Sequence, residues 1–146
     1  MILKEATINE LNDLVRLGLD LWPNSNENEL FKVFRDSIDS TKEATVIYKD
    51  KNMVVGFILL SLRYDHVPGS SSKPVGYIEG IYVVPKYRKK GIGKKLAIFG
   101  EEWAKQKGCK EYASDAELTN IVSHEFHRKI GFKEANKLVC FIKQIE

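Results

Sequence analysis

The sequence has few cysteines and no long apolar run. Its two cysteines, Cys109 and Cys140, are far apart and have no C-x-x-C spacing. This argues against a zinc site or a redox pair and favours buried free thiols. No apolar stretch approaches the roughly 20 residues of a membrane-spanning helix. The first residues also lack the charged-then-apolar pattern of a signal peptide. We therefore expect a cytoplasmic protein without a metal ion.

The sequence has no strong charge imbalance, and it is too short for a second domain. The 146 residues carry a net charge of +3, and 43% of them are hydrophobic. This is enough for one domain, residues 1–146, to bury its own core. Much of the positive charge lies in residues 86–95. Such clustering favours a compact polyanionic ligand over the dispersed basic face that nucleic acid requires. We expect neither nucleic acid nor a membrane as a partner.

Hydrophobic periodicity predicts an α/β fold in the order β-α-α-β-β-β-α-β-α-β. Asn9 is the predicted N-cap of the first helix, which Pro23 ends. A long loop over residues 63–74, rich in glycine and serine, is expected to be functional or mobile. The strands are predicted at residues 3–6, 44–48, 53–62, 75–84, 111–114 and 132–145. The helices are predicted at residues 9–21, about 30–38 and 120–130, with a further helix that begins at the glycines of residues 91–93 and runs through residue 103.

A basic, glycine-spaced loop follows the predicted strand 75–84 and opens a helix. Gly91 and Gly93 allow several backbone N–H groups at the helix N-terminus to approach one anion, with the helix dipole behind them. The spacing fits neither a Walker loop nor a dinucleotide-binding fingerprint. A solvated basic helix start is the alternative to the phosphate cradle that we predict. Four basic side chains surround it: Arg88, Lys89, Lys90 and Lys94.

Two carboxylates occupy positions where chemistry could occur. Glu79 lies inside an apolar strand, on the same predicted face as Tyr77 and Ile81. If that face is buried, its charge needs a cation or a hydrogen-bonding ligand, whereas on the solvent face it needs neither. Asp115 follows the predicted strand 111–114, where α/β proteins place ligand-binding groups, although a helix cap would also explain it.

Arg88-x-x-Gly91-x-Gly93 after a strand that ends in Val84-Pro85 resembles the pyrophosphate-binding motif of the GCN5-related N-acetyltransferases. The resemblance implies a mixed central sheet flanked by helices, with acetyl-coenzyme A as cosubstrate. It also implies that a backbone N–H near Val83 binds the thioester carbonyl. The implied coenzyme-binding residues are Ile81, Tyr82, Val83, Arg88, Lys89, Lys90, Gly91, Ile92, Gly93 and Lys94.

Five blocks in order resemble the aminoglycoside 6'-N-acetyltransferases. They are Leu21-Trp22-Pro23, Ser61-x-Arg63-x-Asp65-x-Val67-x-Gly69, Pro74-Val75 with Glu79–Val83, Gly108-Cys109-x-Glu111 with Ala113–Asp115, and Asn120-x-x-Ser123-x-x-x-His127-x-x-x-Gly131-Phe132.

In that group the residues at Trp22, Glu79 and Asp115 contact the aminoglycoside, and the residue at Asn120 contacts the coenzyme. Trp22 could otherwise be a core residue. His66 and Asn136, on the implied sugar-binding rim, stand where relatives often carry tyrosine and some carry glutamate.

The combined hypothesis is an acetyl-coenzyme A dependent enzyme that modifies the 6'-amine of aminoglycosides and so confers antibiotic resistance. We expect direct transfer in a ternary complex, because no serine or cysteine has an activating partner nearby in the sequence. Glu79, Asp115 and His127 are the predicted catalytic residues, although His127 could be structural. The alternatives are another amine, such as a polyamine, a protein N-terminus or lysine, and a non-catalytic coenzyme-binding protein.

Relatives in this group are commonly homodimers, and we expect one here. The apolar segment 138–142 could pair or exchange across the subunit boundary. It could instead complete the sheet of a monomer.

Overall fold

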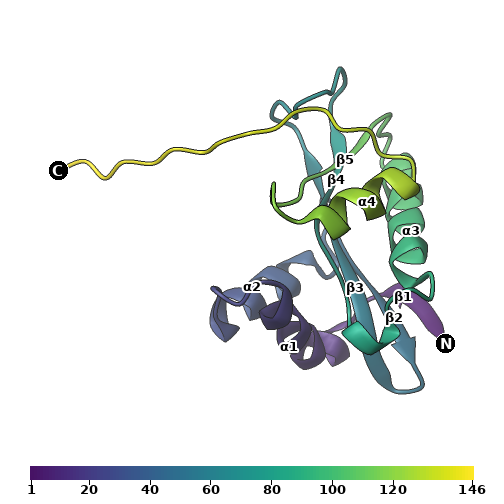
Figure 1. The fold of residues 1–146 in the computed structure, drawn as a ribbon. Helices are drawn as coiled ribbons and strands as arrows, with labels where there is room; N and C mark the ends of the chain where they lie inside the picture. Colours follow the sequence, from purple (N-terminus) through teal and green to yellow (C-terminus); the bar gives the residue numbers. More distant parts are fainter.

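The computed structural model describes all residues, 1–146 (Figure 1). Its order is strand, two helices, three strands, helix, strand and helix. The strands are β1 (Ile2–Glu5), β2 (Glu43–Asp50), β3 (Met53–Arg63), β4 (Val75–Val83) and β5 (Tyr112–Ser114), and the helices are α1 (Leu11–Leu21), α2 (Glu27–Ser37), α3 (Ile92–Gln106) and α4 (Ile121–Lys129), with short 3-10 turns at Ile8–Glu10 and Pro85–Tyr87.

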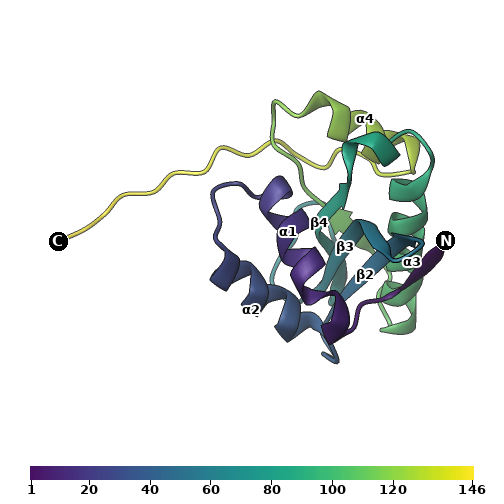
Figure 2. The same ribbon diagram turned by 90° about the horizontal axis from the view of Figure 1, so that it is seen from below.

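The five strands form one sheet in the order β1-β2-β3-β4-β5. The first three pairings are antiparallel and β4–β5 is parallel, so the sheet is mixed, as predicted. Helices α1 and α2 cover one face and α3 covers the other, while α4 lies near β5 and the start of α3 (Figure 2). None of the helices combines the length and the apolar character needed to cross a bilayer.

Each face of the sheet buries its own apolar core. On the α1–α2 face, the buried rings of Phe34 and Phe57 meet edge to face with their centroids 5.2 Å apart. On the α3 face, Leu96 packs against Ile58 and Leu60. Burial of each such side chain contributes roughly 1.5–3 kcal/mol. The two cores therefore hold the middle of the sheet rigidly, and the site lies where strand pairing ends.

The sheet opens between β4 and β5. The parallel pairing ends at Ile78 opposite Ser114, while β4 continues to Val83 without a strand on that side. The β3–β4 register shifts at the same place, since Leu59 pairs with Gly80 and Leu60 with Ile78. Glu79 is the extra residue in this β-bulge, which bends the strand and re-aims its side chains.

The bulge corrects one sequence prediction. Ile78 and Ile81 both contact the α3-side core, so the strict alternation of β4 is broken at Glu79. Glu79 shares a face with Tyr77, as predicted, but Ile81 points to the opposite face. Regular alternation cannot anticipate a bulge, because one inserted residue reverses every side chain beyond it.

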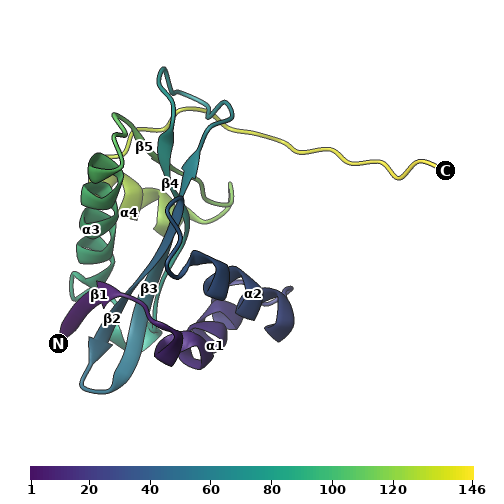
Figure 3. The same ribbon diagram turned by 180° about the vertical axis from the view of Figure 1, so that it is seen from behind.

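The N-cap and the end of the chain also differ from prediction. Asn9 does not cap α1, because it lies inside the 3-10 turn that precedes the helix. Thr7 caps that turn: its hydroxyl accepts the Asn9 N–H while Glu10, which stands at the N-cap position of α1, accepts the Thr7 N–H. Residues 133–146 form no strand and run away from the body as an exposed, extended segment (Figures 1 and 3). Cys140 lies in that segment and is exposed, and Cys109 is only half-buried. The last predicted strand is absent, and the outer edge of β5 stays unpaired.

Candidate active site

The gap between β4 and β5 presents free backbone groups. The Val84 N–H donates to the Val55 carbonyl at 2.9 Å, on the β3 side. Because N–H groups point alternately to the two sides of a strand, the Val83 N–H faces the gap. This is the donor that the sequence predicted for a thioester carbonyl. Ser114 ends β5 at the narrow end of the gap.

The predicted phosphate cradle has the backbone geometry of an anion site. Gly91 precedes α3 with a left-handed φ of 82°. The first helical hydrogen bond runs from the Lys95 N–H to the Gly91 carbonyl at 3.1 Å, so the amides of residues 92–94 precede the first helical bond. A methyl group on Gly93 would lie 3.1 Å from the Phe126 ring of α4. The cradle is therefore bounded by α4.

The side chains around the cradle point in different directions. The Arg88 Nε donates to the Val83 carbonyl at 2.7 Å, on the side of β4 that faces the gap. Ile92 is buried and can offer a ligand only its backbone. Lys89 and Lys94 are exposed. Lys90 lies over the Tyr87 ring at 5.4 Å, beside a hollow.

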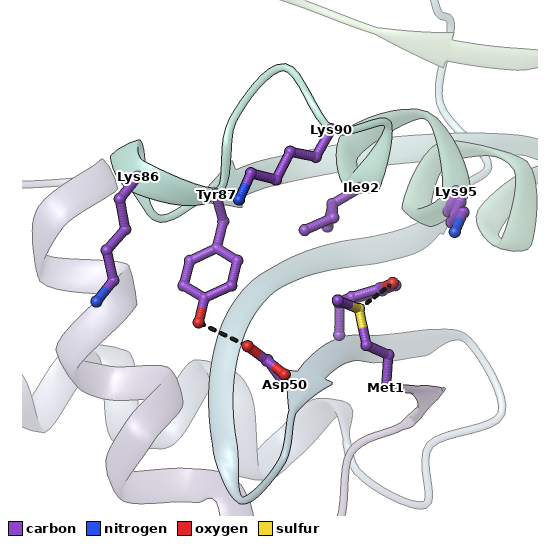
Figure 4. Close-up of a pocket in the computed structure, with 8 residues that line it drawn as sticks. Met1, Asp50, Lys86, Tyr87, Lys90, Ile92 and Lys95 are labelled. Carbon is purple, nitrogen blue, oxygen red and sulfur yellow. Dashed lines mark hydrogen bonds between the residues drawn. The ribbon is translucent and has the colours of Figure 1, made fainter.

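That hollow, of about 430 Å3, lies between the start of α3 and the end of β2 (Figure 4). The Tyr87 hydroxyl donates to Asp50 across it at 2.7 Å. Lys86 and Lys95 contribute further positive charge to its wall. Both lysines belong to the basic run 86–95, although no coenzyme-binding role was predicted for them.

Glu79 is fully engaged by cross-strand donors. Arg63 on β3 donates through Nε to Glu79 Oε2 at 2.9 Å and through Nη2 to Oε1 at 2.7 Å, and the Ser61 hydroxyl donates to Oε2 at 2.5 Å. Burial alone would raise the pKa of Glu79, but the hydrogen bonds and charge of Arg63, with Ser61, lower it overall. Glu79 is thus ionised and paired, as the prediction for a buried position required.

A second carboxylate is connected to the first through an aromatic ring. The Tyr77 hydroxyl donates to Asp115 Oδ2 at 2.5 Å, and the Arg63 guanidinium lies 3.4 Å from the centre of the Tyr77 ring. Burial, and then the bond to Asp115, raise the pKa of Tyr77, so it remains a neutral donor. Asp115 caps no helix, because Asn120 caps α4. No site role was predicted for Arg63 or Tyr77. The signal that could have indicated them was the succession of two predicted strands, 53–62 and 75–84, which pair in the structure.

Trp22 lies beside this cluster and is also part of the core. It ends α1 and packs against Phe34 and Phe57, with ring centroids 6.5 and 6.0 Å away. A methyl group on Gly80, next to Glu79, would lie 2.4 Å from the Trp22 ring. Trp22 therefore packs as a core residue, which was the alternative to a sugar-binding role, and its ring also lies next to the β-bulge at Glu79. Its contact with a sugar stays a prediction.

Two predicted rim residues lie at the same end of the molecule. His66 is exposed in the loop after β3, beside a second hollow of about 430 Å3. Asn136 is exposed at the start of the C-terminal segment. Its neighbour Ala135 would lie 2.8 Å from a methyl group on Gly69, so that segment begins against the same loop.

His127 and Asn120 both make structural hydrogen bonds. The His127 Nδ1 lies 2.7 Å from the Ser123 carbonyl, and Nε2 lies 2.8 Å from the Ser114 hydroxyl. The expectation of direct transfer rested only on partners nearby in the sequence, and this pair adds a distant one for Ser114. The two residues are thirteen apart in sequence, which hid the contact.

Asn120 accepts the Ser123 N–H at 3.1 Å as the α4 cap. No group of three or more His, Cys, Asp or Glu could hold a metal ion.

Comparison with known proteins agrees with this arrangement. Residues 11–132 match the model of the acetyltransferase (GNAT) family. Over all 146 residues the chain is 36% identical to the whole of aminoglycoside N(6')-acetyltransferase type 1 of Acinetobacter haemolyticus.

Solved structures show the same similarity. The crystal structure of aminoglycoside antibiotic 6'-N-acetyltransferase AAC(6')-IG from Acinetobacter haemolyticus matches with a TM-score of 0.92 at 34% identity over 100% of both chains. AAC(6')-Iy in complex with the bisubstrate analogue CoA-S-monomethyl-acetylneamine matches with a TM-score of 0.93 at 28% identity, over 99% of this chain and 98% of that one. The fold, the backbone cradle and the match over residues 11–132 together lead to one conclusion: this chain belongs to the acetyltransferase (GNAT) family.

Proposed function

We propose that the protein transfers the acetyl group of acetyl-coenzyme A to the 6'-amine of aminoglycosides. The observation that carries the proposal is a pair of carboxylates beside the gap between β4 and β5. Glu79 lies on β4 and Asp115 lies just after β5, and the same gap presents the Val83 N–H. Aminoglycosides are polycations, which a cluster with two carboxylates attracts. The relatives named for this activity support it at 36% identity over the full length.

The proposed coenzyme site uses mainly the backbone. The amides of residues 92–94 would bind the pyrophosphate, with the dipole of α3 behind them. Lys89 and Lys94, both exposed, would add charge. Ile81, Tyr82 and Val83 border the unpaired part of β4 and would line the pantetheine arm, and Asn120 would contact the coenzyme from the start of α4.

The proposed reaction is a direct transfer. The neutral 6'-nitrogen attacks the thioester carbonyl carbon, a C–N bond forms, and the C–S bond then breaks. The Val83 N–H would stabilise the oxyanion that develops on the carbonyl oxygen. Asp115 or Glu79, directly or through a water, would accept the amine proton. The thiolate leaves with the bonding electron pair and takes up a proton, which His127 would supply from Nε2 when its imidazole is doubly protonated.

The Ser114–His127 contact allows a competing route through an acetyl-enzyme. When His127 is neutral, its Nδ1 must donate to the Ser123 carbonyl that it faces, which leaves Nε2 to accept from Ser114. Direct transfer remains the proposal, because the free Val83 N–H and the two carboxylates serve attack by the amine without an intermediate. Intact-mass measurement after incubation with acetyl-coenzyme A alone distinguishes the routes, since only an acetyl-enzyme gains the mass of one acetyl group.

The biological role that we propose is aminoglycoside resistance, exercised in the cytoplasm, where acetyl-coenzyme A and the ribosomal target of these antibiotics are found. Other amines remain the second candidate, because polyamines and lysine side chains carry the same positive charge. The exposed rim residues His66 and Asn136 would decide among acceptors.

We also propose a homodimer in which the C-terminal segment covers a second copy. Three apolar side chains of this segment are almost fully exposed: Phe141 at 92%, Ile142 at 98% and Ile145 at 88%. Such a contiguous apolar surface is unusual on a monomer. The outer edge of β5 is unpaired in the sheet order and could accept a strand.

The cradle predicts that Gly91→Val weakens acetyl-coenzyme A binding by about tenfold, or roughly 1.4 kcal/mol. A side chain there would cover the approach to the amides of residues 92–94. Gly108→Val is the matched control, because Gly108 also has a left-handed φ, 86°, and open space around an added side chain, but follows the far end of α3. Calorimetry should show weaker binding for Gly91→Val alone, and equal affinities in the two folded variants would contradict the cradle.

The proposed acceptor predicts the position of the acetyl group. Kanamycin A, which has a 6'-amine, should be acetylated rapidly, whereas paromomycin, which has a 6'-hydroxyl, should be spared because a hydroxyl is a poor nucleophile without a stronger base. Thiol release gives the rates, and fragment mass spectrometry gives the ring position. Similar rates for both antibiotics, or a label on another ring, would contradict the 6' assignment.

The dimer predicts a mass of two chains in sedimentation velocity. Phe141→Asp together with Ile142→Asp should produce monomers, because charge opposes burial of this segment. Ile8→Asp is the control, since Ile8 is also a largely exposed apolar residue but lies before α1. A monomeric parent protein, or a dimer that the double substitution leaves intact, would rule out this assembly.

A further inference from the structure

Arg63 is the one cation in direct contact with the proposed acceptor cluster, where a cationic substrate would also have to bind. Its guanidinium forms a two-pronged pair with Glu79, and the flat face of the same group lies 3.4 Å from the centre of the Tyr77 ring. Tyr77 in turn donates to Asp115. One side chain therefore contacts the first carboxylate directly and the second through a single ring.

The two carboxylates differ in how fully they are engaged. Both oxygens of Glu79 accept hydrogen bonds from Arg63, and Oε2 also accepts from Ser61. Asp115 is bonded through Oδ2 to Tyr77, and its Oδ1 has no side-chain partner. Asp115 is exposed, whereas Glu79 and Arg63 are half-buried. Asp115 therefore has the freer oxygen for an incoming amine.

We infer that Arg63 is a positioning residue of the acceptor site. It holds Glu79 in one orientation as an ionised hydrogen-bond acceptor, and its stacking keeps the Tyr77 ring where the hydroxyl orients Asp115. The division of roles follows: Glu79 binds and orients the amine, while Asp115, with its free oxygen, is the carboxylate that accepts the proton. This inference rests on the proposed function for the identity of the acceptor.

A lysine could not perform the same task. A guanidinium is planar and presents its N–H donors in a fixed fork that matches both oxygens of a carboxylate, and the same plane stacks on an aromatic ring. An ammonium group provides the charge without the fork or the stacking. Arg63→Lys and Arg63→Gln therefore separate the charge from the geometry.

The polar and charged groups linked to the Arg63–Glu79 pair come from three elements. Strand β3 contributes Arg63 and Ser61, β4 contributes Tyr77, and Asp115 follows β5. Arg63 is the only cation among them. Its loss would leave the half-buried Glu79 with no compensating charge, so protonation of Glu79 would become easier and acid would reduce activity.

The test compares kcat/KM for kanamycin A at about pH 6 and pH 8 in the parent, Arg63→Gln and Arg63→Lys. The ratio of the pH 6 value to the pH 8 value should fall by about tenfold in Arg63→Gln and stay near the parent value in Arg63→Lys, which keeps the charge. Both variants should have a raised KM for kanamycin A and an unchanged affinity for acetyl-coenzyme A. Arg16→Gln, on the exposed side of α1, controls for the loss of one positive charge.

The background variant Glu79→Gln makes the test specific. In that background Arg63→Gln should no longer change the pH ratio, because the group whose protonation it controls is absent. An unchanged ratio in Arg63→Gln alone, or the same change in the Glu79→Gln background, would overturn the inference. A merely structural role would lower the melting temperature without changing the ratio.

A second measurement needs neither activity nor a variant. Carboxyl-carbon NMR of the parent protein should show Glu79 ionised at pH values where an ordinary glutamate is half protonated. Titration of Glu79 at or above that pH would overturn the inference even if Arg63→Gln does not fold. If kanamycin A is not a substrate while Glu79 titrates low, the proposed function fails and the role of Arg63 stands.

Discussion

The end of β4–β5 pairing at Ile78 is the constraint on which the rest of the site depends. Parallel strands that stayed paired would use the Val83 N–H in the sheet and leave no room for a ligand. The bulge at Glu79 coincides with this point, so the same irregularity frees the backbone beyond it and directs the carboxylate towards Arg63 and Ser61. The rigid cores on both faces of the sheet hold the gap open.

Charge is distributed along the gap in a way that suits two unlike ligands. The start of α3 offers amides and lysines, which favour an anion, while the opposite end carries two carboxylates, which favour a cation. The Arg63–Glu79 pair reduces the negative charge at that end without removing it. A polycationic acceptor and a pyrophosphate-bearing coenzyme would therefore bind at separate places and meet near Val83.

The sequence predicted most of the fold because its periodic segments are long and strongly apolar. The mixed sheet was confirmed, as were the family and all four helices to within a few residues. Three features could not be read from a local pattern. The bulge at Glu79 depends on the partner strand, the Ser114–His127 contact joins distant segments, and the segment expected as a strand at residues 132–145 leaves the open edge of β5 in its own chain unpaired. The roles of the site residues stay predictions.

The most direct test of the central claim is a crystal structure of the protein with acetyl-coenzyme A bound. The account predicts that the pyrophosphate lies on the amides of residues 92–94. It also predicts that the thioester carbonyl oxygen accepts a hydrogen bond from the Val83 N–H at about 2.7–3.2 Å, within the β4–β5 gap. A coenzyme bound outside that gap, or a thioester carbonyl with a different donor while the Val83 N–H stays free, would contradict it.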